Sequence, residues 1–171
     1  MADKGAYAYY MRVPFATGSA TAAGFEGWVR LTEFSFDIKA YVSFLADLFD
    51  EEAEDDRTEV EFSTFKMKKR IDDASGELLL QALSADDGSQ DECCIEVVVC
   101  APDAGKGGRP KIYAHYFLEE AIIVGYSFDD SGGNPTEEIV VSYNEIRAEF
   151  MPHNAEVAGD AIVRVHHDLH E

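Results

Sequence analysis

The chain has little cysteine, little positive charge and no long apolar run. Its three cysteines, Cys93, Cys94 and Cys100, are close together in one β-patterned segment. Adjacent residues on a strand point to opposite faces of a sheet, so these thiols do not suit a disulfide framework. No stretch approaches the roughly 18 apolar residues of a membrane-spanning helix. The first residues also lack the basic start and apolar core of a secretory signal, so we expect synthesis and folding in the cytoplasm.

Positive charge is scarce, because 14 lysines and arginines stand against 34 aspartates and glutamates, a net charge of −20. Such a charge opposes binding to nucleic acid phosphates and to anionic membranes, so we expect neither partner. Solubility, adaptation to high salt, or a surface that repels an anionic passenger would each explain the acidity. Charge alone does not separate these three explanations.

The motifs of common catalytic and metal sites are also missing. The segment 105–111, GKGGRPK, lacks the Ser or Thr that follows the lysine of a phosphate-binding loop. Adjacent carboxylates occur at 119–120, 129–130 and 137–138. Neighbours on a strand diverge, so none of these is a general acid–base pair. The acidic residues 50–56 have no EF-hand spacing and the histidines of 166–170 offer too few fixed ligands. We therefore expect that the protein is not an enzyme and that it binds no cofactor and no metal ion.

Strand patterns dominate what the chain does contain. Residues 7–15 and 25–38 mix aromatic and β-branched residues in near alternation, and both faces of the second segment are partly apolar. This suits a barrel strand whose outer face meets a neighbouring subunit. The small residues 17–24 predict a flexible loop between them. Further strands are expected at 93–101, 111–118, 120–128, 138–150 and 160–167. Their short, regular spacing favours an antiparallel barrel or sandwich in one domain.

One short helix interrupts this pattern. Ser75 is placed to cap a helix over 76–85, with Glu77 in the first turn, where a negative charge complements the helix dipole. An apolar stripe follows, made of Leu78, Leu79, Ala82 and Leu83. We expect this helix to lie across the barrel and to close one side of its core.

A long loop of unusual composition spans residues 39–61. It begins with an apolar patch, in which Phe44, Leu45, Leu48 and Phe49 have helical spacing, and then becomes strongly acidic. Two interpretations remain open. The segment is either a solvated loop packed on its own barrel or an extended arm whose apolar end docks on an adjacent subunit.

A second candidate contact collects positive charge before residue 112. Lys106, Arg109 and Lys111 lie together in a chain that is otherwise strongly negative. They form either an ordinary hairpin loop or a contact for an acidic patch on the next subunit. The candidate subunit-interface residues are therefore Tyr41, Phe44, Leu45, Leu48, Phe49, Lys106, Arg109 and Lys111.

The order of features between residues 7 and 150 resembles the Hcp tube proteins of bacterial type VI secretion systems, which are related to the tail tube proteins of contractile phages. An opening strand pair precedes a long loop, then a strand, a Lys-rich turn and a Leu-rich helix at 62–83. A hairpin and a strand that ends in Ser follow. A loop with Pro and Glu at 134–138 then leads into a strand with Tyr143 and Ile146.

This resemblance implies a mainly β protein, an antiparallel barrel with one short α-helix and a long extended loop. The barrel core would span about 7–150, with a C-terminal strand and His-rich tail at 153–171. The resemblance further implies stacked, hexameric rings that form the inner tube of a contractile injection system. Sheath, baseplate or spike components and effector proteins in the lumen would be its partners. The tube would be assembled in the cytoplasm and expelled on contraction, without a signal peptide.

A second function class stays open from the residues alone. A soluble monomeric β-barrel could bind or turn over a small ligand, with Trp28, Tyr113 and Tyr126 lining its pocket. Aromatic residues in a barrel more often belong to the core, and no converging polar set supports the pocket. Oligomeric state separates the two classes, because a ligand-binding barrel functions alone and a tube wall does not.

Overall fold

The structure is a computed structural model that describes residues 7–41, 59–85, 92–101, 109–151 and 163–168. These residues form one helix and ten strands, in the order β1 (Ala8–Arg12), β2 (Val29–Ser35), β3 (Ile38–Tyr41), β4 (Glu59–Phe62), β5 (Phe65–Arg70), α1 (Ser75–Ser84), β6 (Cys93–Cys100), β7 (Ile112–Asp129), β8 (Thr136–Ser142), β9 (Glu145–Phe150) and β10 (Val163–Asp168). No helix among these residues is long and apolar enough to cross a membrane.

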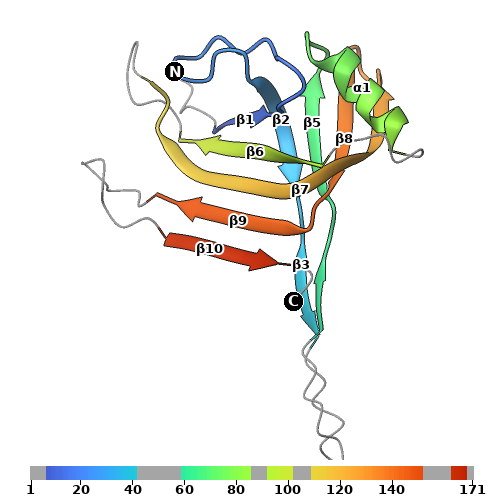
Figure 1. Cartoon of the computed structure of the whole chain (residues 1–171). Coiled ribbons are helices and arrows are strands. Elements are labelled where there is room, and N and C mark those ends of the chain that lie inside the picture. Colours follow the sequence, from blue (N-terminus) through green and yellow to red (C-terminus); the bar gives the residue numbers. More distant parts are fainter. Residues whose placement is uncertain (1–6, 42–58, 86–91, 102–108, 152–162, 169–171) are drawn as a thin grey trace, which may run out of the picture.

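Six antiparallel strands close a barrel. β1 pairs with β2 and β6, β2 with β5, and β5 with β8. The early part of β7 pairs with β6 and its later part with β8, which completes the circle. This confirms the antiparallel barrel with one short helix. β9 adds to the early part of β7, and β10 adds to β9, so the sheet extends beyond the barrel on one side (Figure 1).

The long strand β7 replaces the two strands expected at 111–118 and 120–128. Glu120 has a positive φ of 49°, and the register with β8 shifts between Ile123 and Gly125. The chain therefore bends near these residues and does not reverse, which lets one strand serve two neighbours in succession. Conversely, the segment expected as one strand at 138–150 divides into β8 and β9. There the Asn144 N–H donates to the Glu119 carbonyl over 3.2 Å.

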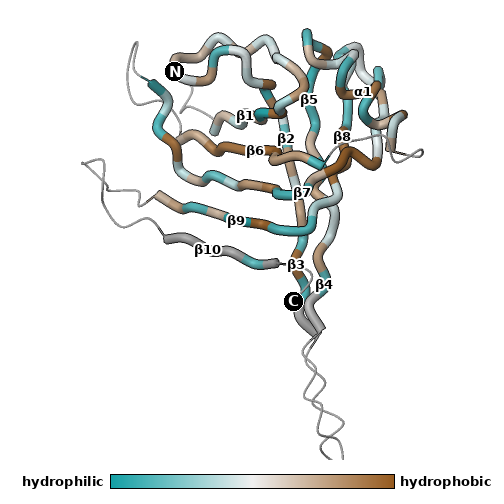
Figure 2. Tube along the Cα trace, viewed as in Figure 1, coloured by the Kyte–Doolittle hydropathy of each residue, from teal (hydrophilic) through white to brown (hydrophobic). Residues whose placement is uncertain are grey.

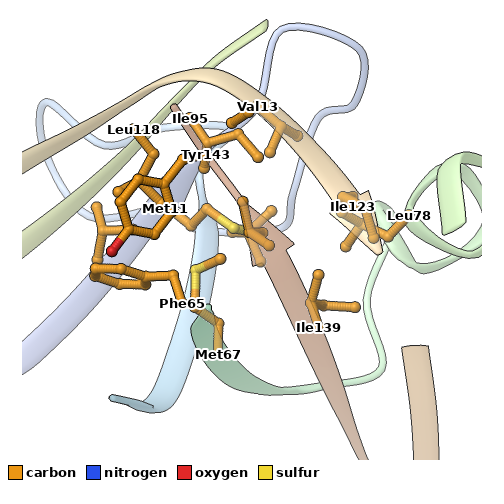
Figure 3. Packing of buried hydrophobic residues seen from close by; sticks show 14 of the residues in the cluster. Met11, Val13, Phe65, Met67, Leu78, Ile95, Leu118, Ile123, Ile139 and Tyr143 are labelled. Carbon is orange, nitrogen blue, oxygen red and sulfur yellow. The ribbon is translucent and has the colours of Figure 1, made fainter. Parts of the chain in front are cut away.

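Alternating side chains of these strands fill the barrel. The main buried cluster includes Met11, Leu31, Phe65, Met67, Ile95, Leu118, Ile123, Ile139 and Tyr143 (Figure 3). A hydropathy view shows β6 and the bend of β7 as the most apolar stretches (Figure 2). The core is therefore built mainly by the period-two pattern that the sequence carries.

Helix α1 packs across β7 at one side of the barrel (Figure 1). Leu78 is fully buried and lies beside Ile123 (Figure 3), and Ala82 packs against the same cluster. The other two members of the expected stripe, Leu79 and Leu83, are 40% and 68% exposed. Half of the stripe therefore closes the core as expected, and the other half faces outward.

The N-terminus of α1 differs from the expected cap. Ala74 occupies the N-cap position and provides no side-chain cap. The Ser75 hydroxyl instead accepts a hydrogen bond from the Asp72 N–H over 3.0 Å, while the Asp72 carboxylate accepts one from the Ala74 N–H over 3.0 Å. Ser75 is thus the first residue of the helix, and its side chain closes the turn before it.

The loop after β1 is held by its own backbone, in contrast to the flexible linker expected at 17–24. Gly18 and Gly27 are joined by a 2.7 Å hydrogen bond, and the Ala20 N–H donates to the Trp28 carbonyl over 3.0 Å. A Cβ on Gly18 would come within 2.4 Å of the Trp28 carbonyl oxygen. The small residues therefore serve close backbone packing, which composition alone does not distinguish from flexibility.

Candidate functional site

Most of the predicted subunit-interface residues fall outside the described part of the chain. Tyr41 ends β3, and only its backbone is described. Four arm residues and one loop lysine lie in undescribed segments, namely Phe44, Leu45, Leu48, Phe49 and Lys106. Only Arg109 and Lys111 can be located with their surroundings.

Arg109 and Lys111 lie at the foot of the loop that joins β6 to β7. Gly24 has a φ of +85°, and a Cβ there would come within 2.3 Å of Arg109 Nε, so the guanidinium packs directly on this glycine. The Lys111 carbonyl accepts a 2.9 Å hydrogen bond from the Ala101 N–H, which closes the base of the loop. The basic candidate surface is therefore supported by the ordered loop after β1.

The antiparallel pair β3–β4 projects away from the barrel at the other end of the molecule (Figure 1). Asp37 and Ser63 clamp its base, because the Asp37 N–H donates to the Ser63 hydroxyl over 2.7 Å and the Ser63 N–H donates to the Asp37 carbonyl over 2.9 Å. Phe62 stacks on His167 of β10, with ring centroids 5.0 Å apart. The stem of the long loop thus leaves the barrel far from the basic residues. The described ends of the two predicted patches, β3 and the start of β7, therefore lie apart (Figure 1).

A buried ion network joins α1 to the barrel wall. Lys69 on β5 is 0% exposed and Glu137 on β8 is 2% exposed. The Lys69 ammonium donates to Glu137 Oε2 over 2.5 Å and to the Ser75 hydroxyl over 2.9 Å, and it lies 2.8 Å from Asp72 Oδ1. Three partners match the three N–H groups of an ammonium. The network therefore fixes the turn that starts α1.

Glu137 completes the same network from the other side. Its carboxylate accepts hydrogen bonds from Lys69, from Ser75 over 2.8 Å and from the Tyr126 hydroxyl over 2.6 Å. Burial opposes its charge, but these three donors outweigh burial and hold the pKa of Glu137 below its usual value. Burial and the bond to Glu137 raise the pKa of Tyr126 to about 12. Glu137 therefore stays ionised and Tyr126 stays protonated at neutral pH.

A charged array covers the outward face of β1, β6, β7 and β9. Arg12 pairs with Glu96, and Glu96 lies 2.9 Å from His115 Nε2. Arg147 lies over the Phe117 ring at 3.8 Å and contacts Glu119 and Glu149 at 3.5 Å. Burial lowers the pKa of His115 despite the neighbouring Glu96. The positive and negative side chains on these strands pair with one another, so much of the charge on this face is neutralised within the chain.

The cysteines are unsuited to nucleophilic chemistry. Burial raises the pKa of both Cys93 and Cys100 to about 11, and burial together with Glu96 and Glu119 raises the pKa of Cys94. All three are unpaired thiols. Among the described residues no group of three or more potential ligands could hold a metal ion.

The aromatic residues proposed for a ligand pocket do not converge. Trp28 lines a hollow with Arg12 and Glu96, and Tyr113 lines another with Tyr7. Tyr126 belongs to the buried network with Glu137. These three residues therefore do not form one binding site.

Comparisons with known proteins identify the family of this barrel. The family model of the type VI secretion system effector Hcp matches residues 10–150. The chain therefore belongs to the Hcp family of type VI secretion system tube proteins. No curated protein shows significant sequence similarity to it.

Solved structures share the fold at low sequence identity. One described as a type six secretion system protein is 17% identical, covers 96% of both chains and has a TM-score of 0.76. Hcp1 from Salmonella typhimurium is 14% identical over 96% of both chains, with a TM-score of 0.68. The secreted protein Hcp3 from Pseudomonas aeruginosa is 18% identical, with 95% of this chain and 98% of that chain covered and a TM-score of 0.63.

Proposed function

We propose that the chain is a wall subunit of a type VI secretion tube, assembled as hexameric rings that stack end to end. The projecting β3–β4 pair is the observation that carries this proposal, because both ends of the long loop join the described chain away from the barrel (Figure 1). A loop that starts away from its own core is suited to reach another subunit. Family membership supports tube assembly over an isolated barrel.

The contacts of the ring would join unlike surfaces. A closed ring uses a head-to-tail interface, in which two different patches of the same chain meet. The basic residues Lys106, Arg109 and Lys111 are one proposed patch. The arm, with Tyr41, Phe44, Leu45, Leu48 and Phe49 followed by acidic residues, is the other. Support comes from their opposite charges in the sequence and from the separation of β3–β4 from the start of β7 (Figure 1).

The activity proposed here is assembly and transport. Effector proteins would travel in the lumen, and the tube would be expelled with them when a surrounding sheath contracts. Sheath, baseplate or spike components would be its other partners. The raised pKa values of the cysteine thiols and the dispersed aromatic residues fit a protein without catalytic function.

Electron microscopy of the purified protein, with light scattering for mass, tests this function. We expect rings or stacked tubes with a mass near six chains or a multiple of it. Alanine at Phe44, Leu45, Leu48 and Phe49 should disrupt rings and leave the fold intact, whereas alanine at the exposed Val124 of β7 is a matched apolar control. A monomer under all conditions would contradict the proposal and favour a ligand-binding barrel. Unchanged rings in the arm variant would remove only the arm from it.

A further inference from the structure

Helix α1 is apolar on its outer side as well as on its inner side. Leu78 enters the core, but Leu79, Leu80 and Leu83 are 40%, 54% and 68% exposed. These three residues, here called the leucine face, are neighbours on the outward side of a helix whose only charged residue is Glu77. A helix that is apolar all round is normally buried on all sides. The leucine face is therefore an apolar surface that the described residues leave uncovered.

A groove of matching character runs from the start of β7 to the turn that precedes α1. Two adjoining hollows of about 390 and 470 Å³ share Tyr7, Tyr9 and Thr32 in their walls. Phe34 and Tyr113 are among the other residues that line the first hollow, and Arg30, Arg70 and Asp72 are among those that line the second. Volumes of this order hold ligands or anchoring side chains. These residues are called the tyrosine groove.

The groove and the helix carry complementary charge. Arg70 makes no ion pair within the described part of the chain, and Arg30 donates only to the neutral Tyr10 hydroxyl, at 2.9 Å. The two carboxylates in the groove walls already have cations, because Glu33 lies 3.5 Å from Lys68 and Asp72 lies 2.8 Å from Lys69. The groove therefore has unpaired positive charge.

The helix has the opposite excess. The carboxylates of Glu77 and of Asp73, just before α1, form no ion pair with any other described residue. Both residues are exposed and flank an apolar surface without a cation. An acidic helix edge and an arginine-bearing aromatic groove are matched in both charge and polarity.

We propose that the tyrosine groove of one chain receives the leucine face of α1 from a second copy of the chain. This deepens the proposed ring, on which it rests, by adding a second contact beside the one between the arm and the basic residues. In Figure 1, the starts of β1 and β7, next to Tyr7 and Tyr113, lie away from α1, whereas the other end of the groove reaches the turn between β5 and α1. Two different patches of one chain form a head-to-tail contact, which closes into a ring when the rotation permits.

A second copy fits this groove better than an anionic surface does. The net charge of −20 opposes approach to membranes and nucleic acid. Two copies also repel each other, so their contact must avoid facing carboxylates, and the leucine face supplies a surface without charge. Arg30 and Arg70 then receive the carboxylates at its edge.

Two complementary variants test the contact. Leu80→Ser with Leu83→Ser removes the leucine face and keeps the groove, and Tyr7→Ser with Arg70→Ser removes the groove and keeps the helix. All four residues are exposed, so both variants should fold. Each double variant alone should form at least about tenfold fewer rings than the wild-type protein. An equimolar mixture should form a one-to-one dimer that grows no further, because the arm contact alone does not hold neighbours together and only one intact groove meets one intact leucine face. Val124→Ser, an exposed apolar control outside both surfaces, should form normal rings.

Light scattering, with circular dichroism to check folding, gives the result. Rings from either double variant, or a mixture that stays monomeric, would overturn the proposed contact while wild-type rings still support the tube function. Failure of wild-type protein to form rings at any salt concentration would overturn the tube function itself. If Leu80→Ser with Leu83→Ser unfolds, the single change Leu83→Gln at the last turn is read by the same criteria.

Discussion

Lys69 has the most unusual environment of any single residue in the described chain. It lies on β5 between two inward-facing carboxylates and a hydroxyl, with no exposed surface. Removing a charge from water is costly, and only a complete set of partners offsets that cost. The network therefore stabilises one arrangement of the turn before α1 more than it adds general stability.

Breaking this network on one side should destabilise the fold strongly. Lys69→Met leaves Glu137 buried without its ammonium, and we expect a loss of about 3–5 kcal/mol in the free energy of unfolding. Lys69→Met with Glu137→Leu removes both charges and should cost clearly less. Urea unfolding of both variants measures this difference, and equal losses would show that leaving Glu137 without its ammonium carries no extra cost.

Acid should reduce the contribution of the same network. The pKa of Glu137 is lowered in the fold from a usual value of 4.5. A lowered folded pKa means that the stabilisation is complete above the unfolded pKa and is lost as pH falls through the folded pKa. The stability advantage of wild type over the double variant should therefore shrink below about pH 4.5, by up to about 1.4 kcal/mol per pH unit. An advantage that stays constant down to pH 3 would contradict this assignment.

The sequence pattern of β5 indicates that Lys69 faces the core, which the amino-acid composition alone does not show. In the β5 sequence FKMKKR, Phe65, Met67 and Lys69 share one parity, so the strand pattern places this lysine on the inner face. An inward lysine requires a carboxylate partner. Which of the 34 acidic residues supplies it depends on the pairing of β5 with β8, which the sequence does not specify.

At the scale of elements, α1 separates residues that look equivalent in the sequence. Leu78→Ala should cost about 2–5 kcal/mol, because the side chain is fully buried beside Ile123. Leu80→Ala, at 54% exposure, should change the stability of the isolated chain by no more than about 0.5 kcal/mol. Thermal unfolding of protein kept monomeric by dilution compares them. Similar losses would place Leu80 in the core as well.

Element types were predictable, but their ends were not. The alternation that builds β1, β2, β5 and β6 was readable because one face of each meets the core. The bend in β7 was not, because Glu119 and Glu120 resemble a turn in sequence, whereas the register shift near Ile123 lets the strand continue. The sequence also did not show which leucines of α1 face the core, because the helix could turn about its axis in several ways and still bury two of them.

For the whole molecule, the order of features identified the family and the barrel, because a loop, a Lys-rich turn and a helix in that order restrict the possible folds. Arg109 and Lys111 stay predicted interface residues, and Arg109 packs on Gly24. The proposed leucine face and tyrosine groove combine residues of several strands and a helix. The residues of each surface are brought together by the pairing of the barrel strands, which the sequence does not specify.

Salt should act on assembly through the charge of the whole chain. Six copies would carry 6 × −20 = −120, and this repulsion opposes every contact between them. Screening shortens the reach of exposed charges to about 10 Å at 0.1 M salt. The attractive pairs proposed at the interface are few and close together, so salt weakens them less than it weakens the long-range repulsion. Rings should therefore be more abundant at about 0.5 M than at about 0.02 M sodium chloride, as measured by light scattering. More rings at low salt would show instead that local attraction between unlike patches controls assembly.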